Sequence, residues 1–140
     1  MIINRAVYDL ILCKISNNHG ETGGIIGGQD DVVTEFEFDM GTDLSSRDHY
    51  YPATDKLNAC IDRWQDNNIQ FYGIVHSHLL DAPKLSLGDE KYIHAIMKVM
   101  PVCINYLYFP IVVVPSKRIV SYKAVRNGGI DIIRDDVKII

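Results

Sequence analysis

The chain has 140 residues, a length that suits one domain with a single core, so we expect residues 1–140 to form one domain. Its hydrophobic content of 47% and charged content of 23% are typical of globular proteins and exclude the disordered and collagen-like classes. The net charge of -4 provides no excess of Lys and Arg for a phosphate-binding surface, so we expect no nucleic-acid partner.

The N-terminal run and the cysteines indicate the cellular compartment of the protein. The run "MIINRAVYDLILCKI" has no basic opening and no small-residue cleavage site, so it does not read as a signal peptide. No apolar run approaches the roughly 20 residues that span a bilayer. Cys13, Cys60 and Cys103 form no C-x-x-C pair, and we expect reduced, mostly buried thiols. These features predict a cytoplasmic protein with no membrane partner, and they leave its oligomeric state open.

The first half of the chain alternates between helical and strand patterns. Apolar residues at three- and four-residue spacing predict an amphipathic helix over roughly residues 3–17. The run "TGGIIGGQD" predicts a short strand, and "DVVTEFEF" predicts a half-exposed strand that pairs with it through Gln29-Asp30-Asp31. Residues 40–52 contain many turn formers and predict an irregular loop. A second helix is expected from about Ala53.

The second half completes an α/β pattern. The apolar run "IQFYGIVHSHL" predicts a buried central strand. Pro83 interrupts the loop that follows, and a third helix is expected from near Ser86. The segments "NYLYFPIVVVP", "RIVSYKAV" and "GIDIIRDDVKII" predict two or three closing strands, antiparallel because their connections are short. The order α-β-β-α-β-α-β-β-β predicts a mixed sheet flanked by helices.

The stretch "VHSHLLDAPKLSLGD" contains the residues with the clearest potential for chemistry. Side chains alternate along a strand, so His76 and His78 point to the same face, about 7 Å apart along the backbone. Asp89 falls in the first turn of the third helix, and the intervening loop is long enough to bring that turn over the strand end. Two imidazole nitrogens and one carboxylate leave the fourth tetrahedral position open, as in catalytic zinc sites.

Two further residues decide between a structural and a catalytic interpretation. Ser86 and Asp89 match the pattern S-x-x-[DE], so a capping box explains both without a metal. Glu21 precedes "TGGIIGG" in a turn that leads into a candidate neighbour of the His-bearing strand. A carboxylate at that edge could take a proton from a water molecule at the metal, although an exposed turn glutamate is the commoner case.

The arrangement Glu21…His76-Ser77-His78 followed by Ser86-x-x-Asp89 resembles the JAMM motif of the JAB/MPN zinc metalloproteases. The runs "ETGGIIGG", "FYGIVHSH" and "LSLGDEKYI" resemble the short prokaryotic branch of that family, and the resemblance covers roughly residues 1–127. It implies a cytidine-deaminase-like α/β fold and one Zn²⁺ ion held by His76, His78 and Asp89. It also implies that Glu21 acts as general base and that Ser86 donates a hydrogen bond to the oxyanion.

The implied activity is zinc-dependent hydrolysis of an amide or isopeptide bond. The substrate would be the C-terminal tail of a ubiquitin-like or sulfur-carrier protein, or another peptide. Many family members have proline directly after the second histidine; Leu79 takes that place here, which bears on the rigidity of the loop and on substrate fit. A catalytically silent JAB/MPN module that binds proteins and a zinc hydrolase of a small molecule are the alternatives. A nucleoside deaminase of similar fold would need a P-C-x-x-C pair, which the chain lacks.

Overall fold

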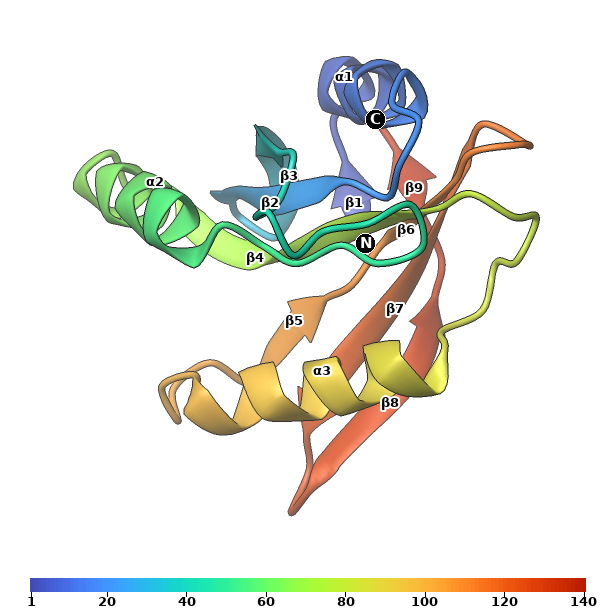
Figure 1. The fold of residues 1–140 in the computed structure, drawn as a ribbon. Helices are drawn as coiled ribbons and strands as arrows, with labels where there is room; N and C mark the ends of the chain where they lie inside the picture. Colours follow the sequence, from blue (N-terminus) through green and yellow to red (C-terminus); the bar gives the residue numbers. More distant parts are fainter.

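The computed structural model describes residues 1–140 and shows three helices packed on one mixed β-sheet (Figure 1). The first half contains β1 (Ile2–Ile3), α1 (Arg5–Ser16), β2 (Gly23–Gln29), β3 (Val32–Asp39) and α2 (Thr54–Asp66). The second half contains β4 (Gln70–His78), α3 (Leu87–Val99), β5 (Tyr106–Tyr108), β6 (Ile111–Val113), β7 (Arg118–Arg126), β8 (Ile130–Asp135) and β9 (Lys138–Ile139). The predicted α/β class is confirmed. No helix is long and apolar enough to cross a membrane.

Strand β4 lies near the centre of the sheet. It pairs antiparallel with β2 on one side and parallel with the short strands β5 and β6 on the other. Strand β7 pairs antiparallel with β5, β6 and β8, and β3 pairs antiparallel with β2. The predicted central position of the His-bearing strand is therefore confirmed. The predicted β2–β3 hairpin is also confirmed, with Asp30 and Asp31 at the positive φ angles of 51° and 60° that a tight two-residue turn requires.

The two faces of the sheet bear separate hydrophobic cores, because side chains alternate along each strand. Val75 belongs to the core that includes the buried residues of α1. Ile74 belongs to the other core, together with buried residues of α2 and α3. His76 and His78 share the parity of Ile74 and so lie on the α2 and α3 face. The fold therefore directs both imidazoles toward the layer that contains Asp89.

Several predicted boundaries were wrong, and each error has a physical cause. The predicted helix at residues 3–17 begins only at Arg5, because Ile2–Ile3 form β1, which pairs with β3 and β9. The predicted strand "NYLYFPIVVVP" is two strands, β5 and β6, interrupted at Phe109–Pro110, where proline has no N–H to donate. The segment "GIDIIRDDVKII" also divides into two, β8 and β9. Strand β9 pairs parallel with β1, so the antiparallel prediction holds only for the pairs that β7 makes.

The expectation of mostly buried thiols was also wrong. Cys60 is buried, but Cys13 and Cys103 are exposed. Cys13 lies on the solvent side of α1, and Cys103 lies in the turn that follows α3.

Candidate metal centre

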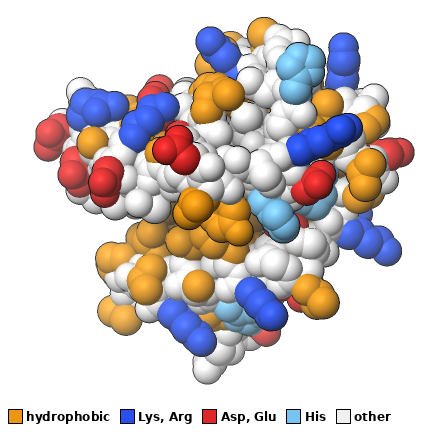
Figure 2. Space-filling view, viewed as in Figure 1, with side chains coloured by type: hydrophobic (Ala, Val, Ile, Leu, Met, Phe, Trp, Pro, Cys, Tyr) orange, Lys and Arg blue, Asp and Glu red, His pale blue; other side chains and the backbone are white.

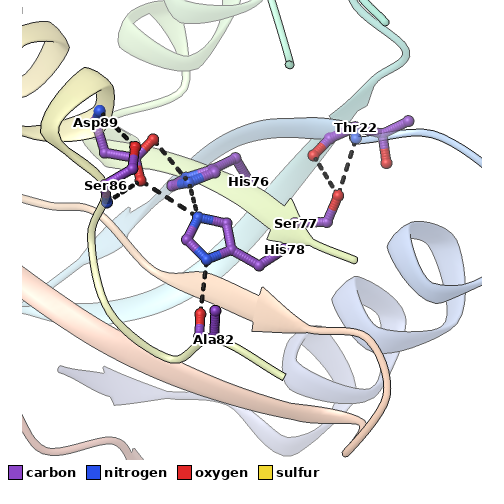
Figure 3. Close-up of polar contacts among 7 residues, drawn as sticks. All are labelled: Thr22, His76, Ser77, His78, Ala82, Ser86 and Asp89. Carbon is purple, nitrogen blue, oxygen red and sulfur yellow. Dashed lines mark hydrogen bonds and ion pairs between the residues drawn. The ribbon is translucent and has the colours of Figure 1, made fainter. Parts of the chain in front are cut away.

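Two histidines and one aspartate converge where β4 ends beside the start of α3 (Figure 3). The Nε2 atoms of His76 and His78 lie 3.0 Å apart. The Asp89 carboxylate places one oxygen 3.3 Å from His76 Nε2 and the other 3.3 Å from His78 Nε2. Tetrahedral ligands at about 2.0–2.1 Å from zinc are separated by roughly 3.3 Å. The types of the donor atoms and their spacing therefore fit a single zinc ion.

The loop after β4 fixes the tautomer of His78. Its Nδ1 lies 2.7 Å from the carbonyl oxygen of Ala82. A carbonyl oxygen only accepts hydrogen bonds, so Nδ1 carries the proton and the Nε2 of the neutral ring keeps its lone pair. A metal ligand requires that lone pair, and partners of this kind orient metal-binding histidines. The loop reaches back to its histidine even though it begins with Leu79 rather than proline.

Asp89 also belongs to the capping box of α3. Its backbone N–H donates to Ser86 Oγ at 3.1 Å, and its Oδ2 accepts from the Ser86 N–H at 2.7 Å. The capping interpretation is therefore confirmed for both residues. The same carboxylate nevertheless contacts both imidazoles, so the cap and the candidate metal centre coexist. The cap holds the carboxylate in the position from which it reaches the histidines.

The charges at this centre favour a cation. Burial raises the pKa of Asp89, but contacts with His76, His78 and the Ser86 N–H outweigh it and hold the pKa well below its usual range. Burial lowers the pKa of His78, but the Asp89 carboxylate and the Ala82 carbonyl outweigh it and leave the pKa raised. Asp89 is therefore ionised at neutral pH, which is the form that binds a metal.

The pairing of β2 with β4 places Glu21 beside His78. Gly23 pairs with His76 in an antiparallel register, so extending the register by two residues sets Glu21 opposite His78. Glu21 lines the same cleft as both histidines and Asp89. The predicted neighbourhood of the two strands is confirmed. Burial, against the opposing effect of His78 and together with the charges of Asp89 and Asp48, raises the pKa of Glu21 to about 7.

Ser77 fixes the backbone next to Glu21, a role that the sequence did not reveal. The side chain of Ser77 is fully buried, and its Oγ accepts from the Thr22 N–H at 3.0 Å and donates to the Thr22 carbonyl at 3.3 Å (Figure 3). The Ser77 N–H donates to the same carbonyl at 2.9 Å. The residue between the two histidines thus fixes the residue after the candidate base. A small polar residue at a buried strand position is the only signal that could have indicated this.

We expect Ser77→Ala to lower the free energy of unfolding by about 1–3 kcal/mol. The substitution leaves the buried Thr22 N–H without its acceptor, and an unsatisfied buried donor costs about that amount. Urea unfolding of the metal-free protein measures the change. Ser116→Ala is the matched control, because its exposed hydroxyl only accepts from Arg118, and it should change stability by less than about 0.5 kcal/mol. Equal losses in the two variants would contradict the role of Ser77.

The segment of residues 40–53 forms one wall of the cleft, and contacts with β2 and β3 hold it in place. Asp39 is buried at the end of β3, and its carboxylate accepts from the Tyr50 hydroxyl at 2.6 Å. The Tyr50 ring packs on Gly23, where an added Cβ would lie only 2.6 Å from the ring. The Glu21 N–H donates to the Arg47 carbonyl at 3.1 Å. This segment therefore supports both the cleft wall and the backbone of Glu21.

All five residues singled out from the sequence lie around one cleft of about 600 Å³, namely Glu21, His76, His78, Ser86 and Asp89. The candidate base, the two nitrogen ligands and the carboxylate ligand thus share one cleft. Ser86 stands at its rim, exposed, with its Oγ engaged in the helix cap. Their separate roles in catalysis stay predictions.

Three solved structures share this fold over the whole chain, each at 17% sequence identity. Protein DSY2949 from Desulfitobacterium hafniense matches with a TM-score of 0.73, and 93% of its own chain is covered. The JAB1/MPN domain protein AF2198 from Archaeoglobus fulgidus matches with a TM-score of 0.58 and 99% coverage. A structure described as JAMM, a metalloprotease-like zinc site in the proteasome and signalosome, matches with a TM-score of 0.56 and 97% coverage.

No protein-family model and no curated protein sequence matches the chain. The similarity to known proteins is therefore one of structure, and at 17% sequence identity it establishes the fold alone. The chain has the JAB/MPN fold, with a candidate His-His-Asp metal site that resembles the JAMM motif.

Proposed function

We propose that the protein is a zinc-dependent hydrolase of amide or isopeptide bonds. The observation that supports this is the convergence of two imidazole nitrogens and one carboxylate at 3.0–3.3 Å, with a second carboxylate, Glu21, in the same cleft. Three ligands leave one tetrahedral position open, as catalytic zinc sites require. A structural zinc site would need a fourth protein ligand, and His76, His78 and Asp89 are the only members of the cluster.

In this proposal, one set of residues binds the metal ion and another residue transfers protons. His76, His78 and Asp89 would hold the ion, which when bound supplies a Lewis acid for the scissile carbonyl and acidifies water at its open position. Glu21 accepts a proton from the attacking water and passes it to the leaving amine. Ser86 stands at the rim, where its hydroxyl can donate to the carbonyl oxygen as negative charge develops there.

The substrate that we propose is the C-terminal tail of a ubiquitin-like or sulfur-carrier protein, with another peptide as the broader class. The cleft is open and lies at the surface where β4 ends, so a chain terminus or a flexible loop can enter it. We place this reaction in the cytoplasm, because the exposed thiols of Cys13 and Cys103 are free and suit a reducing compartment.

The test combines metal analysis with hydrolysis. The purified protein should contain one zinc ion per chain and cleave a short peptide fused to the C-terminus of a sulfur-carrier or ubiquitin-like protein. A zinc chelator should abolish cleavage, and added zinc should restore it. A protein that binds zinc one-to-one yet cleaves none of these fusions would favour the silent binding module, and a protein that binds no zinc would overturn the proposal.

A further inference from the structure

The cleft beside the candidate metal centre is much larger than an ion needs. Its volume of about 600 Å³ lies within the range of ligand-binding pockets. It extends between the segment of residues 40–53 and α3, and its floor is formed by Ile74, Ile93 and Phe109, all buried residues of one core. Figure 2 shows hydrophobic side chains gathered in the hollow between α2 and α3, with histidine at one end. An apolar surface is therefore continuous with the site of chemistry.

The charged groups around this cleft are of one sign. Glu21, Asp48 and Asp89 line it, and no lysine or arginine does. Asp89 belongs to the candidate metal centre, so Glu21 and Asp48 are the carboxylates that a substrate in the cleft would meet. An anionic side chain would find no lysine or arginine to pair with and would have only the metal ion as a positive partner, whereas an uncharged apolar side chain would pack against the apolar lining. Outside the metal centre, the lining therefore offers no positively charged side chain to an acidic substrate residue.

Tyr92 provides a polar group that the protein itself does not use. It lies three residues after Asp89 on α3, so it occupies the same helix face as the candidate ligand and lines the cleft. The opposite wall differs, because the Tyr50 hydroxyl donates to Asp39. Tyr92 is 37% exposed, and its partial burial raises the pKa of its hydroxyl to about 12, with no hydrogen-bonding group contributing. Its hydroxyl therefore stays protonated at neutral pH and is free to donate.

We propose that the cleft binds a large uncharged side chain of the substrate, aromatic or branched aliphatic, next to the scissile bond, and that the Tyr92 hydroxyl donates a hydrogen bond to the substrate backbone. This inference rests on the proposed hydrolase function and names the feature that its substrates share. The apolar lining of the cleft supplies the affinity for the side chain, and the unpaired hydroxyl sets the position of the backbone. Tyr92 thus positions the substrate backbone through its hydroxyl and lines the side-chain pocket with its ring, and it takes no part in proton transfer.

The test uses binding as well as turnover. A series of peptides carries Phe, Leu, Ala or Glu at successive positions around one scissile bond. Affinity is measured on the zinc-loaded Glu21→Gln protein, and kcat/KM is measured on the wild type. At one position we expect Phe and Leu to exceed Ala by at least about tenfold in both measurements, because burying such a side chain is worth at least that factor. Glu at that position should bind no better than Ala.

Variants of Tyr92 separate its ring from its hydroxyl. Tyr92→Phe should weaken all peptides by a similar factor of about 2–10, the typical effect of one hydrogen bond. Tyr92→Ala should in addition reduce the preference for Phe over Ala. Lys98→Ala is the matched control, because Lys98 is an exposed residue of the same helix that does not line the cleft, and it should leave the preference unchanged.

The two proposals fail in different ways. Equal affinity for the Phe and Ala peptides at every position, or no measurable binding, would overturn the inference about the cleft even if the wild type hydrolyses peptides. A clear preference in binding that disappears in Tyr92→Ala, with no hydrolysis by the wild type, would support the cleft and overturn the hydrolase. An unchanged preference in Tyr92→Ala would remove Tyr92 from the inference.

Discussion

His78→Ala should remove bound zinc and hydrolysis together. The substitution takes away a ligand nitrogen that lies 3.0 Å from His76 Nε2 and 3.3 Å from the Asp89 carboxylate. Removing only the partner that orients a ligand typically weakens metal binding by 10–100-fold, so losing the ligand itself should cost at least about 100-fold. Metal analysis after purification measures the occupancy, and activity should fall to background.

Thermal unfolding gives an independent measurement of the same effect. Zinc at about 100 times its dissociation constant stabilises a protein that binds it by about 2.7 kcal/mol, so the Tm of the wild type should rise when zinc is added. The Tm of His78→Ala should not respond. His49→Ala is the matched control, because His49 lines the same cleft but lies outside the converging cluster, and it should keep its zinc. A loss of zinc in His49→Ala, with retention in His78→Ala, would show that the ion binds elsewhere.

Much of the candidate centre could be predicted because its parts are local in the sequence. His76 and His78 share a face through strand alternation, and Ser86 with Asp89 forms a helix cap that any S-x-x-D sequence allows. The position of Glu21 depends on the long-range pairing of β2 with β4, which the sequence indicated only as a candidate neighbourhood. The contact between His78 and the Ala82 carbonyl could not be predicted from the sequence, because every residue has a carbonyl and only the path of the loop selects one.

The fold shows the same division between local and long-range information. The three helices were predicted from residue periodicity and the central strand from a continuous apolar run, and both signals are local properties of the sequence. Strand β1 was missed because Ile3 also fits the apolar stripe of the following helix. Only their parallel pairing with β3 and β9, from the far end of the chain, gives them strand structure. Pro110 could have suggested the division between β5 and β6, since proline cannot donate to a neighbouring strand.

Glu21→Gln should keep zinc and lose turnover. The substituted amide side chain has the size of the glutamate but cannot accept a proton, and a positioned general base typically contributes at least about 100-fold to the rate. We therefore expect a fall in kcat of that size or more, with one zinc per chain retained. If zinc and activity fell together, Glu21 would be a ligand and its proposed role as base would be wrong.

The pH dependence of stability tests the burial of Glu21 in the metal-free protein. Burial raises its pKa to about 7 from an ordinary value of 4.5, so between these values the folded protein binds more protons than the unfolded chain. The contribution of Glu21 to stability is therefore present below the ordinary value and is lost as the pH rises through about 7. Glu21→Gln does not titrate, so its stability relative to the wild type should increase from pH 5 to pH 8. Urea unfolding in the presence of a chelator measures this difference. A difference that stays constant with pH would mean that the Glu21 carboxylate is fully hydrated, which would also remove the physical basis for its pKa near neutrality.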